Sequence, residues 1–473
     1  MMLPQYRSVW SDRAWHTNAL LLLIGFGLIL LTRQLVSEFD HFTIGFSGVG
    51  GWSVIVYLAA VAVILTQPVN RATFGIILAV GIVCRVILLV PVPEMSSDIY
   101  RYAWDGVVQH AHISPYRYVP GDPALEFLRE PNQELFDNIN RRDYAHTIYP
   151  PAAQMLFYVI TFVNPAVTTM KLAMVLLEGL TLWALVLLLR DMGMRREQCL
   201  LYAWCPLLIW EIGSSGHIDS AMMAFLVPAM LFRLRGKPAW TGLFLGVAVL
   251  IKFFPLVLFP ALYRRWDWKM PAAMVGFIVF AYACYLRVGM KVFGFFGGYV
   301  VEEGVDTGSR FFLLELARHV PGLGHLPTGV FLAFGAAVMG TLALWCWRQS
   351  GPGMRGSSDL LAAGVRGDAL FLQRAMMLAF ATMLLFSPHY PWYVVWLVPF
   401  LALMPNLPVL AYVCGLFYLC MTPLGAGTVV AQYSLNRILY AGVFVAFFFS
   451  LALKRWPVHL ALLRVRGHEG RAA

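Results

Sequence analysis

Long apolar stretches recur along almost the whole chain and constrain its fold more than any other feature. Examples are residues 20–35, 74–92, 172–189 and 329–345. A helix of roughly 20 apolar residues crosses the ~30 Å hydrocarbon core of a membrane. Only 13% of the residues are charged and 60% are hydrophobic, whereas about a quarter of the residues of a soluble domain are charged. The sequence therefore predicts an all-α polytopic membrane protein.

The basic residues, which give a net charge of +10, lie in short loops between the apolar stretches. Membrane topology explains this pattern better than a nucleic-acid partner, because no long basic face is present. The first apolar stretch is expected to be retained as a helix, since no small-residue cleavage pattern follows it. All 7 cysteines lie in or beside apolar stretches. We therefore expect neither a disulfide framework nor a cysteine metal site.

The distribution of Lys and Arg predicts the orientation, because short basic loops stay in the cytoplasm. Residues 1–91 are expected to form N-terminal membrane helices with a cytoplasmic N-terminus, followed by an outer loop at 92–150. The basic loop at 190–196 should be cytoplasmic again. Two apolar stretches separate it from the outer loop, so the short one at 151–163 is predicted to be re-entrant or interfacial.

The rest of the chain continues this alternation. Membrane helices are expected over 151–346, with a second outer loop at 289–326, then a cytoplasmic linker at 347–368. Residues 369–473 should form the C-terminal membrane helices and a basic cytoplasmic tail. The total is about twelve to fourteen membrane helices, and no internal repeat is evident.

The first outer loop begins with the motif SSDIYRYAWDG. If this motif is helical, Asp98 and Asp105 lie on one face, about two turns apart. A carboxylate can accept the proton of an attacking sugar hydroxyl, and aromatic rings offer apolar faces to sugars. Asp98 and Asp105 are therefore candidate catalytic residues, and Tyr100, Arg101 and Tyr102 are candidate substrate-binding residues. The alternative is an interfacial helix with aromatic anchors.

Two further motifs combine turns with polar or aromatic side chains. Tyr149 precedes two prolines, which either shape a rigid surface over a site or simply begin a helix. His217 and Asp219 form a His-x-Asp pair that suits contact with an acceptor hydroxyl, a helix cap or a metal ion. A metal is the least favoured of these, because no matching His or Cys cluster accompanies the pair.

Arg85 and Lys252 lie inside apolar segments. A charge at such a place costs a few kcal/mol and usually faces a cavity or a partner, for which a lipid phosphate is suitable. The alternative is that both side chains extend to the headgroups.

The last motif, HYPWY, occupies a short outer turn and combines an imidazole with three aromatic rings. Its candidate substrate-binding residues are His389, Trp392 and Tyr393, since an imidazole can contact a phosphate or a sugar. Three acidic residues of the second outer loop are instead expected on the solvated surface: Glu302, Glu303 and Asp306.

Five motifs in this order resemble the GT-C superfamily of membrane glycosyltransferases. The resemblance is closest to the polyprenol-phosphate-mannose-dependent group, glycosyltransferase family 87 (DUF2029-like), and it spans nearly the full length. The motifs are SSDIYRYAWDG at 96–106, YPP at 149–151, SGHID at 215–219, KFFP at 252–255 and HYPWY at 389–393.

The resemblance implies a bundle of the GT-C type whose partly helical first outer loop packs over an outward-facing cavity. It implies a donor sugar, expected to be mannose, linked to a polyprenyl phosphate in the membrane, and a glycan or glycolipid acceptor. A single inverting displacement follows, with Asp98 as the general base and Asp105 in support. The candidates for stabilising the departing phosphate are Arg85, Lys252, His217 and His389.

The same resemblance places the enzyme in a bacterial inner or plasma membrane with its site on the non-cytoplasmic side. No cofactor is expected, and metal-independent transfer is favoured over use of a divalent cation. The sequence departs from many superfamily members in having an additional pair of helices before Asp98.

A transporter or flippase for a lipid or a lipid-linked sugar is the alternative function. The long outer loop and the placement of the motifs on one side argue against it, because alternating access needs functional groups reachable from both faces.

Overall fold

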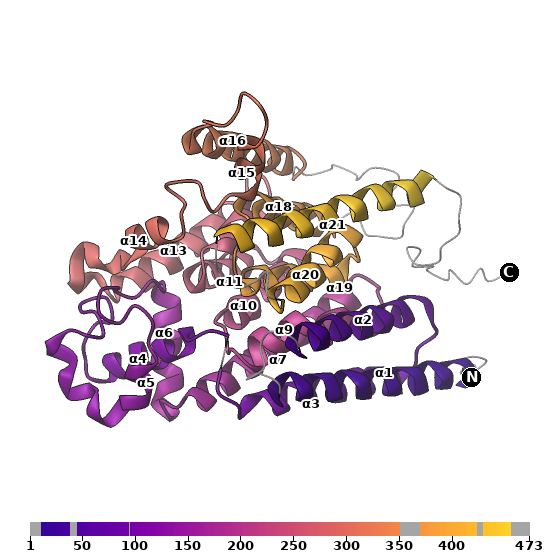
Figure 1. The fold of residues 1–473 in the computed structure, drawn as a ribbon, viewed down its shortest axis with the longest axis horizontal. Helices are drawn as coiled ribbons and strands as arrows, with labels where there is room; N and C mark the ends of the chain where they lie inside the picture. Colours follow the sequence, from indigo (N-terminus) through magenta and orange to yellow (C-terminus); the bar gives the residue numbers. More distant parts are fainter. Residues whose placement is uncertain (1–10, 38–44, 94, 351–368, 423–428, 456–473) are drawn as a thin grey trace.

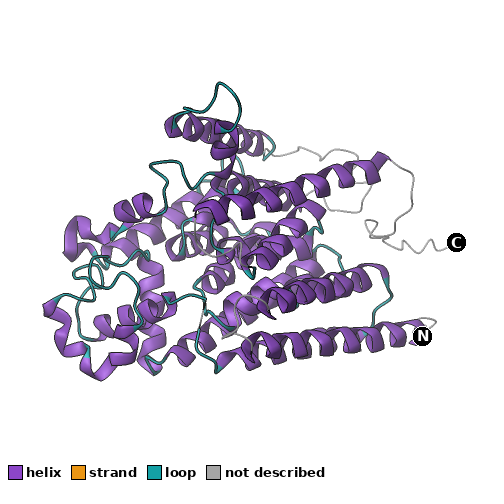
Figure 2. Ribbon diagram, in the orientation of Figure 1, coloured by secondary structure: helices purple, strands orange, loops and turns teal. Residues whose placement is uncertain are grey.

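The computed structural model describes residues 11–37, 45–93, 95–350, 369–422 and 429–455. Every regular element in these ranges is a helix, as Figure 2 shows. The predicted fold class, an all-α polytopic membrane protein, is confirmed. Three segments with predicted locations lie outside the described residues: the N-terminal ten residues, most of the linker at 347–368 and the basic tail.

Six of the described helices are long and apolar enough to cross a membrane. A bent pair, Lys269–Ala283 and Leu286–Glu302, makes a seventh candidate, and five shorter apolar helices of 10–17 residues accompany them. Length and composition therefore support six or seven spans in the described residues, and the expected total of twelve to fourteen membrane helices stays a prediction. The six long spans are Ala14–Ser37, Gly48–Thr66, Arg71–Leu89, Val167–Asp191, Thr328–Arg348 and Tyr433–Leu453.

The N-terminal helices α1 (Ser11–Ser37), α2 (Gly45–Thr66) and α3 (Arg71–Leu89) pack side by side (Figure 1). A capping box begins α3: the Asn70 side chain accepts from the Thr73 backbone N–H, and the Thr73 hydroxyl accepts from the Asn70 backbone N–H. Asn18 of α1 donates to the Asn70 side chain at 3.1 Å. The start of α3 is therefore tied to its neighbour α1.

The loop at 92–150, called here the first outer loop after its predicted location, folds as a partly helical unit at one end of the bundle (Figure 1). Its helix α4 packs against α6, and Gly106 permits this, because a Cβ there would lie 2.2 Å from Thr161 Oγ1. Helix α6 covers the segment predicted to be re-entrant, and that role stays a prediction. The helices are α4 (Asp98–His110), the 3-10 helices Pro123–Leu128 and Glu130–Asn132, α5 (Gln133–Asp137) and α6 (Pro151–Val163).

The central helices form the core of the bundle. Proline at the first helical position begins two of them, where its missing N–H costs nothing. Helix α11 lies directly on α13, since a Cβ at Gly242 would meet the Met270 carbonyl oxygen at 2.0 Å. The elements are α7 (Val167–Asp191), Arg196–Cys199, α8 (Leu200–Ala203), α9 (Pro206–Gly213), α10 (Asp219–Leu234), α11 (Pro238–Ile251), Phe254–Leu258, α12 (Phe259–Leu262), α13 (Lys269–Ala283) and Leu286–Phe293.

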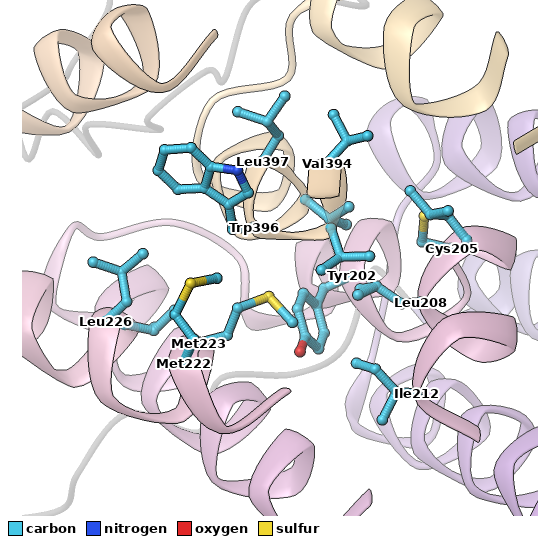
Figure 3. Close-up of a cluster of buried hydrophobic side chains, with 14 of the residues drawn as sticks. Tyr202, Cys205, Leu208, Ile212, Met222, Met223, Leu226, Val394, Trp396 and Leu397 are labelled. Carbon is cyan, nitrogen blue, oxygen red and sulfur yellow. The ribbon is translucent and has the colours of Figure 1, made fainter. Parts of the chain in front are cut away.

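A 3-10 helix at Pro391–Leu397 is buried in the core, and the HYPWY motif at 389–393 overlaps its first turn. Figure 3 shows the helix residues Val394, Trp396 and Leu397 in one buried cluster with side chains of α9 and α10, and all three are fully buried. The remaining C-terminal elements are α14 (Phe296–Glu302), α15 (Phe312–Arg318), α16 (Thr328–Arg348), α18 (Leu370–Phe386), α19 (Val398–Leu403), α20 (Leu407–Cys420) and α21 (Val429–Arg455).

A buried ion pair joins α3 to α7. Arg85 donates to both carboxylate oxygens of Glu178, at 3.0 and 2.6 Å, and also to the carbonyl of Ala203. Both side chains are only 6% exposed. This arrangement satisfies the charge of Arg85 inside the bundle, where an unpaired charge would be costly.

Candidate active site

A cavity of about 440 Å³ lies where the first outer loop meets the bundle. Its walls come from the start of α4, the loop at 140–149, the start of α10, the residue after α11, the α14 region and residues 390–393. The volume falls within the roughly 300–1,000 Å³ typical of pockets for small ligands. Seven of the predicted site residues line it: Asp98, Tyr102, Tyr149, Asp219, Lys252, Trp392 and Tyr393.

Asp98 is the first residue of α4 and faces the cavity, where it is partly exposed. Asn140 Nδ2 donates to its carboxylate at 3.1 Å. The helix N-terminus also favours a negative charge at this position. Within the described ranges, Asp98 has no ion-pair partner.

Lys252 and Asp219 form the second charged feature of the cavity. Lys252 Nζ lies 2.8 Å from both carboxylate oxygens of Asp219, and it lies 4.4 Å from the centroid of the Tyr393 ring. Asp219 begins α10 and is fully buried, whereas the Lys252 side chain is 18% exposed. The sequence motifs SGHID and KFFP therefore meet at one point.

Arg141 is a cavity residue that the sequence analysis missed. Its backbone adopts φ +54°, which is uncommon for a residue other than glycine, and its guanidinium lies 2.6 Å from the Glu302 carboxylate. Burial is the largest single effect and lowers the pKa of Arg141, but Glu302, Tyr390 and Asp98 together raise it further than burial lowers it, so the guanidinium stays charged. Only the fold brings this loop residue to α14, so no local pattern indicated it.

Glu303 is buried and so corrects the expectation of a solvated surface, whereas Glu302 and Asp306 are exposed as expected. Glu303 is 6% exposed, lines the cavity and pairs with Arg310, which is fully buried. The chain turns back at Gly304 with φ +65° and places Arg310 beside Glu303. Because this pairing depends on a turn and not on helical spacing, the charged sequence around it resembled a solvated loop.

Aromatic rings form much of the cavity wall. The Tyr102 and Tyr149 rings meet edge to face at 4.9 Å, and the hydroxyls of Tyr299 and Tyr393 are hydrogen-bonded to each other. Burial, and then the charge of Asp98, raises the pKa of both Tyr102 and Tyr149 well above the usual value. These phenols therefore stay neutral and serve as hydrogen-bonding and stacking groups.

Asp105 is not brought to the cavity. It is buried behind Asp98, where Arg101 Nε donates to it at 2.7 Å and Gln154 Nε2 at 2.8 Å. Arg101 also donates to the Ala145 carbonyl at 3.1 Å. These hydrogen bonds join α4 to α6 and to the loop that supplies Asn140 and Arg141. Arg101 and Asp105 therefore hold elements that line the cavity without lining it themselves.

The other four predicted residues also lie outside the cavity lining. Arg85 is occupied by Glu178, and Tyr100 is buried on α4. His217 is buried and its ring stacks on Trp392. His389 lies behind the wall, where burial and then the nearby Arg310 lower its pKa.

A metal site is not evident among these residues. In the described part of the chain, no three His, Cys, Asp or Glu side chains are grouped so that they could hold a metal ion. Metal-independent transfer stays a prediction.

The fold and the site define a class: a helical membrane protein with a polar cavity lined by three carboxylates, two cations and aromatic rings, a lining that suits a sugar and a phosphate. Residues 21–267 match the family described as "Alpha-(1->6)-mannopyranosyltransferase, N-terminal domain". Residues 147–388 match "Glycosyltransferase family 87". The chain belongs to glycosyltransferase family 87 and to the alpha-(1->6)-mannopyranosyltransferase family. Comparisons with curated proteins and with solved structures found no match.

The family assignment confirms several predictions from the sequence. The protein is a multi-pass membrane mannosyltransferase, so the enzyme is favoured over the transporter. A mannose donor and an acceptor are its substrates.

Proposed function

We propose that this mannosyltransferase takes mannose from a polyprenyl-phosphate-linked donor and transfers it to a hydroxyl of a glycan or glycolipid on the non-cytoplasmic side. Asp98 serves as the general base. The observation that carries this proposal is the pairing pattern of the cavity carboxylates. Asp219 is paired with Lys252 and Glu303 with Arg310, whereas Asp98 accepts only a neutral hydrogen bond among the described side chains.

The reaction proceeds as one displacement. The acceptor oxygen attacks the anomeric carbon while its proton passes to the Asp98 carboxylate. The bond between the anomeric carbon and the phosphate oxygen breaks, and the polyprenyl phosphate leaves with the electron pair. Because one displacement inverts the anomeric carbon, an α-linked product requires a β-linked donor. A single unpaired carboxylate in the cavity suits this mechanism, which needs a base and no enzyme nucleophile.

Lys252 and Arg141 stabilise the departing phosphate. Both line the cavity, and each is held by one carboxylate, Asp219 and Glu302 respectively. Fixed cations next to developing negative charge lower the barrier in a site that excludes water. Arg can contact a phosphate through two parallel N–H groups, whereas Lys acts as a point charge. A phosphate leaves as a stable anion and requires no general acid.

The non-cytoplasmic location is supported by the origin of the cavity walls. Asp98, Arg141 and Tyr149 come from the first loop that the Lys and Arg distribution assigns to the outside, and Tyr299 and Glu303 come from the second. In Figure 1 the helices of the first loop gather at the end of the molecule opposite the C-terminal end of α21.

Asp98→Asn tests the role of the base, because it removes proton acceptance and preserves size. With the purified protein in nanodiscs and radiolabelled polyprenyl-phosphate-mannose, we expect kcat to fall by about 10²–10⁴-fold. Asp143→Asn is the matched control, since Asp143 lies in the same loop with its side chain 78% exposed. Equal rates for Asp98→Asn and the parent would assign the base elsewhere.

The orientation is tested separately with Asp143→Cys and a membrane-impermeant maleimide. In intact cells we expect labelling at this position without permeabilisation, because the loop faces outward. Labelling that requires permeabilisation would place the cavity on the cytoplasmic side.

A further inference from the structure

Three rings form a stack between the core and the cavity: His217, Trp392 and Tyr390, called here the aromatic stack. The His217 and Trp392 ring centroids are 4.2 Å apart with an interplanar angle of 19°. The Trp392 and Tyr390 centroids are 4.6 Å apart at 14°. Trp392 is thus in parallel contact with two rings, which come from two segments far apart in the sequence.

The buried end of the aromatic stack is held by Glu211. His217 Nε2 lies 3.2 Å from the Glu211 carboxylate, and the His217 backbone N–H donates to the Glu211 carbonyl at 3.1 Å. Glu211 is completely buried, and its carboxylate has no hydrogen-bond partner in the described part of the chain. A buried carboxylate is costly unless a charge or a proton accompanies it. The contact between the imidazole and this carboxylate holds the His217 ring in place against Trp392.

The cavity end of the aromatic stack is Tyr390. Trp392 and Tyr393 are 9% and 8% exposed, whereas Tyr390 is partly exposed and lines the cavity. Burial, then Glu303 and more weakly Asp98, raises the pKa of Tyr390. The Tyr390 hydroxyl is therefore neutral and within electrostatic range of the carboxylate proposed as the base.

We propose that Tyr390 is the ring on which the pyranose ring of the acceptor stacks, with His217 and Glu211 as positioning residues that act through Trp392. This inference rests on the proposed function of the cavity. A pyranose presents a face of C–H groups that packs on an aromatic ring. A sugar held on Tyr390 directs a hydroxyl toward Asp98, while Lys252 lies beside Tyr393 and is left for the donor phosphate.

The test compares Michaelis constants for the two substrates, using the whole protein in nanodiscs, octyl α-mannoside as acceptor and polyprenyl-phosphate-mannose as donor. Tyr390→Leu is expected to raise the acceptor KM roughly 3–10-fold and to leave the donor KM unchanged. Tyr390→Phe retains the ring and should keep both values. Tyr158→Leu, a tyrosine on α6 that is 40% exposed and outside the cavity lining, is the control.

A rise in the donor KM alone would overturn the assignment to the acceptor, and unchanged constants would overturn the stacking role. Absence of any transfer by the parent would instead refute the proposed function.

The positioning role has its own comparison. His217→Ala removes the ring beneath Trp392 and should raise the acceptor KM as Tyr390→Leu does. The double variant Glu211→Leu with His217→Phe keeps a ring and removes both polar groups, so its acceptor KM should stay within about threefold of the parent. Equal acceptor KM values for these two variants would refute positioning through the aromatic stack.

Discussion

Asp105→Ala should loosen the first outer loop without touching the cavity. The side chains of Arg101 and Asp105 are 7% and 2% exposed and lie 2.7 Å apart. Removing the carboxylate leaves the Arg101 guanidinium buried without its counter-charge and deprives Gln154 of an acceptor. Breaking a buried ion pair on one side costs about 3–5 kcal/mol.

Hydrogen exchange measures this cost locally. Since every 1.4 kcal/mol is about tenfold in an equilibrium constant, the amides of α4 should exchange roughly 10²–10³-fold faster if they exchange through opening of this loop. Peptides from α20, at a distance from the loop in the bundle, should keep their rates and serve as an internal reference.

Asp137→Ala is the matched control variant. Asp137 also pairs with an arginine, Arg142, but at 3.5 Å and with its side chain 52% exposed. An exposed pair of this kind contributes about 0–1 kcal/mol, so exchange in α4 should hardly change. If Asp105→Ala leaves the protection of α4 intact, Asp105 is not the anchor of the loop.

Three further outcomes are expected. Gly216→Ala should lower the thermal stability measured in detergent, because the residue has φ +64° and its Cβ would lie 2.4 Å from Ile99 Cδ1. Glu178→Gln should lower the melting temperature by leaving Arg85 unpaired, whereas Glu178→Leu combined with Arg85→Met should recover most of the loss; equal melting temperatures for the two would contradict this. Burial and then Arg310 lower the pKa of His389 from 6.5, so the folded state binds fewer protons than the unfolded state and stability falls as the pH drops through 6.5. Melting curves between about pH 7.5 and 5.5 should therefore show a smaller loss for His389→Gln than for the parent.

The helical membrane fold was predictable because apolar length and composition report directly on the solvent that surrounds a helix. The position of Asp98 at a helix start beside the membrane was equally local, and the structure places it in the cavity. Helical spacing predicted that Asp98 and Asp105 share one cavity, but only Asp98 lines it. Two side chains on one face of a helix can still be covered by different neighbours. Here α6 covers Asp105 and leaves Asp98 open.

The contacts that could not be predicted join residues that are distant in the sequence. Glu178 and Arg85 were both recognisable as charges in apolar segments, but a sequence without pairwise information does not show that they satisfy each other. Arg141 lay in an irregular loop with several other arginines, and only contact with Glu302 distinguishes it from Arg142. Tyr390 was visible in its motif, yet its exposure relative to Trp392 depends on the stacking of His217, which lies in the turn between α9 and α10.

The cavity described above is assembled from segments that begin with Met95 and end with Tyr393. A ribosome adds roughly 5–20 residues per second, so Asp98 is synthesised tens of seconds before Trp392 and Tyr393, which line the same cavity. During this interval the nascent chain has only part of the charged lining and lacks the enclosed space that would hold a substrate. Transfer of sugar can therefore begin only after the segment that carries Tyr393 has been made, which keeps a partly made chain from consuming the mannose donor.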